Sequence, residues 1–141
     1  MTKSIKVSML IHDYYPLIGG AQGQLKKLVP LLSEQGIEVS VITRYVVGCP
    51  SYEVIDGIPV YRMPTYRTKV FASLSYTLTS IRYIWKIKPD VIHSYELYSP
   101  TTTAMIAKAL LNIPVAVKIL RGGSLGDIRR LHKKFMGSTR M

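Results

Sequence analysis

The chain has 141 residues, 19 basic and 8 acidic side chains, and a formal net charge of +11. Because 48% of the residues are apolar, the composition excludes a disordered chain and predicts one domain with a hydrophobic core. The single cysteine, Cys49, excludes an internal disulfide framework and a cysteine-rich metal site.

The opening segment predicts a strand, a helix and a second strand. Residues 5–11 are short and mainly apolar, which is typical of a buried strand. Gly19 and Gly20 then open a helix whose apolar residues recur at helical spacing until Gly36. Residues 38–43 form the next strand. A β-α-β unit of this kind requires a parallel pair with a right-handed crossover.

The middle of the chain predicts a hairpin and a long helix. Residues 54–63 are two short strands around an Asp56-Gly57 turn, and Pro59 favours an edge position for the second strand. Residues 69–88 predict a helix with an apolar stripe that faces the core. Its basic neighbours are predicted to face solvent, with a membrane surface as the alternative partner. The stripe is Phe71, Leu74, Leu78, Ile81 and Trp85.

The rest of the chain continues the alternation of strands and helices. The predicted elements are strands at 90–93 and 115–120 and helices at 101–112 and 125–136. The whole pattern predicts an α/β fold, with a Rossmann-like, open, mainly parallel sheet and helices on both faces.

Four loops are predicted to share the edge of the sheet where parallel strands end, which is where ligands bind in such folds. They are 12–20, 44–50, 93–99 and 121–126. Two of them are rich in glycine and lead directly into helices. A helix start offers free N–H donors and a partial positive charge, so these two loops favour a phosphate-containing ligand.

Motif tests exclude several cofactors. The P-loop pattern is absent, and the dinucleotide fingerprint at 18–23 has Ile18 in place of its first glycine. Arg44 ends the second strand where an NAD site needs an acid, so an NADP oxidoreductase is an alternative and an NAD enzyme is not. The histidines lack metal-ligand spacing, and no metal is expected. His93, with Glu96 nearby, is either an ion-paired structural histidine or a substrate contact.

The charge is concentrated in the second half of the chain, where residues 69–141 hold 12 basic and 3 acidic side chains. This asymmetry favours an anionic partner. A basic nucleic-acid-binding module is an unfavoured alternative, because the aromatic residues are not interleaved with the basic tail. The sequence shows no signal peptide and no apolar run long enough for a membrane helix, so we expect a cytoplasmic protein with at most peripheral membrane contact.

Three segments, in this order and spacing, resemble the N-terminal domain of the group 1 glycosyltransferases, which have the GT-B fold. They are residues 15–22 (YPLIGGAQ), 88–93 (KPDVIH) and 113–115 (IPV). The resemblance implies that the first glycine-rich turn faces the cleft between two Rossmann-like domains, and that Gln22 touches donor or acceptor. It also implies acceptor contacts at His93 and Glu96, and a second glycine-rich turn that begins at Arg121. The candidate substrate-binding residues are Gly19, Gly20, Gln22, His93, Glu96, Arg121, Gly122 and Gly123, and no catalytic residue is assigned.

The resemblance also indicates what this sequence lacks. GT-B enzymes bind most of the nucleotide-sugar with a C-terminal domain that has no counterpart here, and Leu120 or Arg121 replaces a histidine found in many relatives. We therefore expect a truncated acceptor-side domain, inactive alone, from an enzyme of the hexosyltransferase type. That enzyme would transfer a sugar, with retention, from a nucleotide-sugar to a sugar, lipid or other acceptor. The alternative is a non-catalytic subunit that pairs with a separate donor-binding chain.

Overall fold

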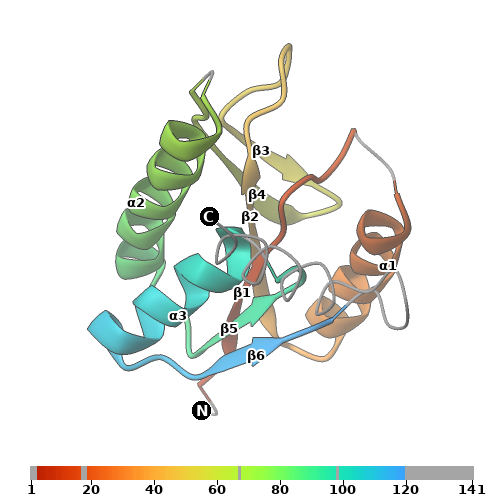
Figure 1. The fold of residues 1–141 in the computed structure, drawn as a ribbon. Coiled ribbons are helices and arrows are strands. Elements are labelled where there is room, and N and C mark those ends of the chain that lie inside the picture. Colours follow the sequence, from red (N-terminus) through yellow and green to blue (C-terminus); the bar gives the residue numbers. More distant parts are fainter. Residues whose placement is uncertain (1–2, 17–18, 67, 98, 120–141) are drawn as a thin grey trace.

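The computed structural model describes residues 3–16, 19–66, 68–97 and 99–119 (Figure 1). The elements are β1 (Lys6–Leu10), α1 (Gly20–Glu34), β2 (Glu38–Arg44), β3 (Tyr52–Ile55), β4 (Ile58–Met63), α2 (Lys69–Ile87), β5 (Val91–Ser94), α3 (Ser99–Leu111) and β6 (Val115–Val117). In this part of the chain they form a six-stranded sheet in the order β3-β4-β2-β1-β5-β6. Only β3 runs antiparallel to its neighbour. The predicted α/β fold is therefore confirmed.

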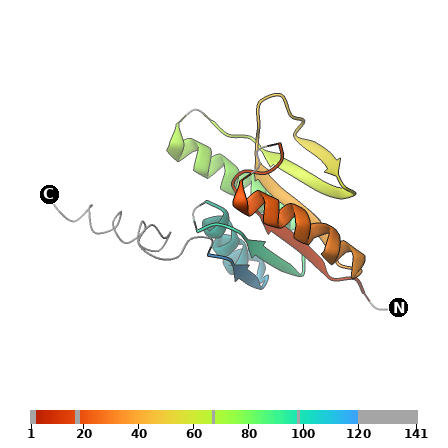
Figure 2. The ribbon, with the colours of Figure 1, turned by 90° about the vertical axis from the view of Figure 1, so that its right-hand side faces the viewer.

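The helices form one layer on each side of the sheet. Figures 1 and 2 show α1 on one face and α2 with α3 on the other. On the first face Leu25 and Val29 of α1 pack against the sheet, and on the second face Tyr76 and Ile84 of α2 do so, together with alanines of α3. The two central strands, β1 and β2, are thus covered on both sides, which explains their almost continuous apolar sequence.

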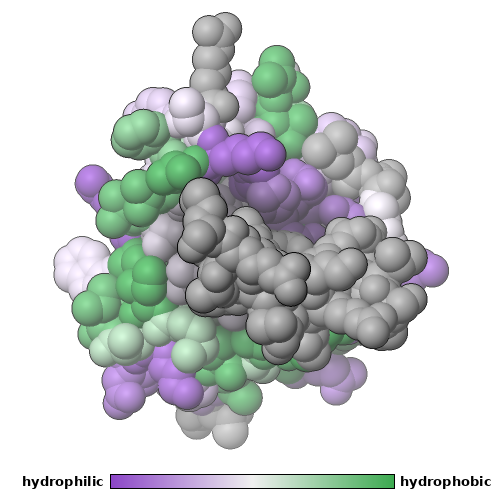
Figure 3. Space-filling model, in the orientation of Figure 1, coloured by the Kyte–Doolittle hydropathy of each residue, from purple (hydrophilic) through white to green (hydrophobic). Residues whose placement is uncertain are grey.

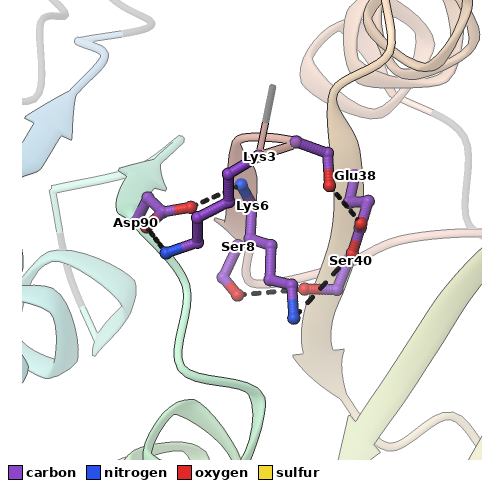
Figure 4. A network of polar contacts seen from close by, with 7 residues as sticks. Lys3, Lys6, Ser8, Glu38, Ser40 and Asp90 are labelled. Carbon is purple, nitrogen blue, oxygen red and sulfur yellow. Dashed lines mark hydrogen bonds and ion pairs between the residues drawn. The ribbon is translucent and has the colours of Figure 1, made fainter. Parts of the chain in front are cut away.

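The amino end of the sheet is closed by polar contacts (Figure 4). Asp90 accepts a hydrogen bond from the backbone N–H of Lys6 at 2.9 Å and forms an ion pair with Lys3 at 3.4 Å. These contacts lower the pKa of the Asp90 carboxyl, mainly through the backbone hydrogen bond. Ser8 and Ser40 share a buried hydrogen bond of 2.9 Å between β1 and β2. The register of the three central strands is therefore fixed at this end.

The predicted hairpin is confirmed, but the expected position of its second strand is wrong. β4 lies inside the sheet between β3 and β2, and β3 is the edge strand. Pro59 is tolerated because the pairing of β4 with β2 begins only at Val60. Its missing N–H therefore falls before the first residue pair of the parallel ladder.

The predicted orientation of α2 is also wrong. The side chains of Phe71, Leu74, Leu78 and Trp85 are 63%, 53%, 68% and 64% exposed. The buried face consists instead of Ala72, Tyr76, Thr77, Ser80 and Ile84. Part of this face is polar and is held by hydrogen bonds. Thr103 of α3 donates to Thr77 at 3.1 Å, and the Tyr76 hydroxyl lies 3.5 Å from the Ile42 carbonyl oxygen. Small hydroxyl residues between α2 and α3 allow close packing that an apolar periodicity does not reveal.

None of the helices in the described part of the chain combines the length and the apolar character that crossing a bilayer requires.

The orientation of α2 can be tested with two alanine substitutions in the same helix. Ile84→Ala should lower the free energy of unfolding by about 2–5 kcal/mol, because it leaves a cavity against the sheet. Leu78→Ala, on the exposed face, should change it by no more than about 0.5 kcal/mol. Urea unfolding followed by circular dichroism measures both values. A loss for Leu78→Ala as large as that for Ile84→Ala would contradict this orientation.

Candidate functional site

The loops at the carboxyl ends of the strands are fastened to β4 by one buried arginine. Arg62 is 1% exposed, and its guanidinium donates to the carbonyl oxygens of Tyr15 at 2.9 Å and of Pro50 at 3.0 Å. It also forms an ion pair with the Glu53 carboxylate. A buried cation requires such partners, so the loops after β1 and β2 must stay where the guanidinium can reach them.

A second set of contacts joins the same two loops. The His12 carbonyl oxygen accepts hydrogen bonds from the Arg44 backbone N–H at 3.1 Å and from the Thr43 hydroxyl at 3.2 Å. The Arg44 guanidinium also contacts Nε2 of His12. Burial and the Arg44 charge lower the pKa of His12, so the ring is neutral and Nε2 accepts. Arg44, the residue on which the NADP alternative depended, is therefore engaged within the protein.

The first glycine-rich turn forms the start of α1. The side-chain oxygen of Gln22 accepts the backbone N–H of Gly19 at 3.0 Å, and α1 begins at Gly20. A Cβ on Gly19 would lie 2.6 Å from that oxygen, so a larger residue here would push the Gln22 side chain out of the cap. The first turn of α1 holds no acidic side chain, which leaves its partial positive charge uncompensated. Gln22 thus has a structural role in the cap, and its predicted substrate contact stays a prediction.

His93 is linked to the beginning of α1 through a lysine and a tyrosine. The rings of His93 and Tyr95 lie 4.8 Å apart, and Nζ of Lys118 lies 5.0 Å from the centre of the Tyr95 ring. The same Nζ donates to the side-chain oxygen of Gln24 in α1 at 2.9 Å. Burial, and then the Lys118 charge, lower the pKa of His93. Gln24 lies one turn beyond the Gly19 cap, so this chain of contacts joins α1, β5 and the end of β6.

Glu96 lies in the loop after β5, where two hydroxyl groups hold its backbone. Its backbone carbonyl oxygen accepts hydrogen bonds from the hydroxyls of Ser94 at 3.2 Å and of Thr101. The pKa of Tyr76 is raised mainly by burial, and the Glu96 charge contributes to this rise. Lys118 is the charged neighbour that shifts the pKa of His93, and the expected pairing of His93 with Glu96 stays a prediction.

The structure brings part of the predicted set together. The predicted residues of α1 and His93 lie at the same edge of the sheet, and Glu96 lies beyond the end of β5. Arg121, Gly122 and Gly123 lie outside the described residues, as do the predicted helix at 125–136 and Leu120. Among the described residues, no three His, Cys, Asp or Glu side chains lie close enough together to hold a metal ion.

Three residues that organise this edge of the sheet were not among the predicted site residues, namely Arg62, Tyr95 and Lys118. Arg62 is a single charge inside an apolar strand, and such a charge signals a buried partner. Lys118 directly follows β6 and could have been assigned to the same edge as His93 from the strand order. The sequence does not identify Tyr95 as a site residue, because a tyrosine that follows a strand can equally be part of the hydrophobic core.

A cavity of about 640 Å³ lies away from these residues. It is lined by the amino ends of β1, β2 and β4, and includes Lys6, Glu38 and Tyr83. Because ligands in open α/β sheets bind at the carboxyl ends of the strands, this cavity is not part of the candidate site.

Comparison with protein families gives a direct result. A family model described as the glycosyl transferase 4-like domain matches residues 19–139. The chain belongs to this family. The sequence resemblance to group 1 glycosyltransferases is thereby confirmed at the level of the family. The search of curated proteins found no match to this chain.

Solved structures agree with the GT-B assignment of this glycosyl transferase 4-like domain. Sucrose-phosphate synthase from Thermosynechococcus elongatus matches with a TM-score of 0.67 at 14% identity, over 92% of this chain and 39% of that one. MurG from Acinetobacter baumannii matches with a TM-score of 0.56 at 21% identity, over 80% and 34% of the two chains. WaaG, a glycosyltransferase involved in lipopolysaccharide biosynthesis, matches with a TM-score of 0.50 at 16% identity, over 64% and 23%. At these identities the matches show a shared fold, and the chain spans well under half the length of each structure.

The electrostatic link between Lys118 and His93 can be measured. In Lys118→Met the pKa of His93 should rise, because a nearby positive charge no longer opposes protonation, and it should stay below 6.5 because burial remains. As the pH falls below 6.5, His93 is protonated in the unfolded chain before it is protonated in the folded chain, and this lowers the free energy of unfolding. Because the two pKa values lie closer together in Lys118→Met, this loss of stability should be smaller in the variant. NMR titration of the imidazole measures the pKa, and urea unfolding measures the stability.

The matched control for this titration is Lys27→Met, which removes an exposed lysine of α1. Its His93 pKa should equal that of the unchanged chain. An unchanged or lower His93 pKa in Lys118→Met would contradict the electrostatic effect of Lys118 on His93.

Proposed function

We propose that this domain is the acceptor-side half of a GT-B glycosyltransferase, which transfers a sugar from a nucleotide-sugar to an acceptor. The family match over residues 19–139 is the observation that carries the proposal. A second domain or a separate subunit would bind most of the donor. This chain alone would then turn over little substrate, and the cytoplasmic location expected from the sequence is part of the same proposal.

The beginning of α1 is suited to the charged end of the donor. Backbone N–H groups of the first helical turn lack intrahelical partners, and no acidic side chain in that turn competes for them. Gly20 has open space around it, with no atom within 4 Å of a Cβ built there, so a ligand can approach the backbone closely. The negatively charged oxygen atoms of a diphosphate suit these backbone N–H groups.

The His93 side of the edge is suited to the acceptor. The lowered pKa keeps His93 neutral at physiological pH, so one ring nitrogen donates a hydrogen bond and the other accepts one. A sugar hydroxyl both donates and accepts. Lys118 holds a cation over the Tyr95 ring, which lies against His93, and is itself fixed by Gln24. This arrangement can orient a hydroxyl near the start of α1, and no catalytic role follows from it.

The proposal is tested by titrating the isotopically labelled chain with uridine diphosphate. Amide chemical shifts should change at residues 19–22 and in the loop after β5. Gly19→Ala should weaken binding severalfold, because its Cβ displaces the Gln22 side chain and disturbs the first turn. Gly23→Ala is the matched control, since nothing lies within 4 Å of its added Cβ and the helix is retained.

Several outcomes would contradict the proposal. Shifts confined to the cavity at the amino ends of the strands would place the ligand at the wrong edge. Equal weakening of uridine diphosphate binding by Gly19→Ala and Gly23→Ala would contradict the role assigned to the glycine-rich turn. A stronger response to NADP than to uridine diphosphate would favour the oxidoreductase alternative. Vigorous sugar transfer by this chain alone would contradict the division between two domains.

A further inference from the structure

The outward surface of α2 combines exposed apolar side chains with basic ones. Phe71, Leu74, Leu78 and Trp85 follow one another at spacings of three, four and seven residues, and each is more than half exposed. Val70 at the first turn is 70% exposed and extends the apolar surface. The basic residues of α2 and its cap are Lys69, Arg82, Lys86 and Lys88, and all four are exposed. We call this surface, made of Val70, Phe71, Leu74, Leu78, Trp85 and these four basic residues, the α2 face.

The neighbouring helix continues this surface. α3 runs beside α2, as the hydrogen bonds of Ser73 with Ser99 and of Thr103 with Thr77 show. Met105 and Leu110 of α3 are 51% and 68% exposed. Figure 3 shows apolar surface, in green, along the side of the molecule where α2 and α3 lie, with hydrophilic groups beside it. Contiguous exposed apolar surface of this kind marks an interaction site rather than scattered exposure.

The charges on this surface have one sign. Neither α2 nor α3 contains an aspartate or a glutamate, and each has a basic residue in its last turn. The surface thus offers apolar side chains for insertion, a tryptophan suited to an interface, and cations for anionic headgroups. Lysine and arginine can extend their charged ends toward headgroups while their stems cover apolar surface.

We propose that the α2 face binds the surface of an anionic lipid membrane. A second copy of this chain fits it less well, because a two-fold contact would place two sets of cations together without any acidic partner. Nucleic acid would use the cations but leave the apolar side chains in water. An anionic bilayer interface satisfies both groups. This inference does not depend on the proposed transfer reaction.

Trp85 gives a direct readout, because it is the single tryptophan of the chain and is 64% exposed. With vesicles of phosphatidylcholine and phosphatidylglycerol, its fluorescence should shift to shorter wavelength and the chain should co-sediment. With pure phosphatidylcholine vesicles both effects should be weak, since each cation near an anionic surface contributes about fivefold to the partition coefficient.

Two double substitutions separate the apolar from the electrostatic contribution. Leu74→Ser with Leu78→Ser should lower the partition coefficient by on the order of tenfold or more, because the lost apolar surface no longer enters the interface. Arg82→Gln with Lys86→Gln should weaken binding to anionic vesicles and reduce its dependence on salt. All four residues are exposed, so circular dichroism should show an unchanged fold.

The matched controls come from α1 on the opposite face. Leu31→Ser removes a leucine that is 57% exposed, and Lys27→Gln removes an exposed lysine. Both variants should bind vesicles as the unchanged chain does. The proposal would be overturned by equal binding to neutral vesicles, by no binding, or by equal losses in the control variants. A lipid-independent fluorescence shift that grows with protein concentration would also overturn it, because a second copy would then cover the α2 face.

Discussion

The buried guanidinium of Arg62 is the constraint on which the functional edge of this domain depends. Arg62 is a residue of β4, and its charge is compensated by two backbone carbonyl groups and one carboxylate from three segments of the chain. Loss of these partners would leave an uncompensated charge in the protein interior, which costs several kcal/mol. The loops after β1 and β2 are therefore held by electrostatics as much as by packing, and the loop after β1 leads directly to the start of α1.

Most of the fold could be predicted from the sequence because its determinants are local. Gly36 and Gly57 adopt positive φ angles where the predicted helix end and turn require them. The two apolar strands around α1 identify themselves by composition. The errors arose where tertiary contacts decide. The hydropathy pattern predicted the wrong buried face for α2, because Thr77 and Ser80 face the protein and the leucines do not. Pro59 lies in an interior strand because it precedes the first residue pair between β4 and β2.

The candidate site was predictable only in part. Gly19 could be found from its position before a helix, and His93 from its place at the end of a short strand. The link between them could not be found, because Lys118 is far from both in the sequence and meets Gln24 and Tyr95 only after the sheet forms. The pairing of Arg62 with Glu53 likewise depends on the register of the hairpin. The sequence predicts the hairpin but not which side chains its register brings together.

The domain thus presents two distinct surfaces. One is the edge at the carboxyl ends of the strands, which carries His93, Lys118 and the backbone N–H groups at the start of α1. The other is the α2 face, where the apolar and basic side chains point away from the core and are exposed in the described part of the chain. The two surfaces are separated by the core beneath α2, so changes to one need not disturb the other.

The most direct test is amide hydrogen exchange in Arg62→Met, compared with Arg82→Met as a control that removes an exposed arginine. The account predicts exchange faster by roughly tenfold or more at residues 12–16 and 45–51, with little change in β1 and α1. Glu53→Gln, which keeps an acceptor but removes the charge, should give a smaller effect at the same residues and also serves if Arg62→Met does not fold. Uniform acceleration throughout the chain, or none in the two loops, would contradict the role assigned to Arg62.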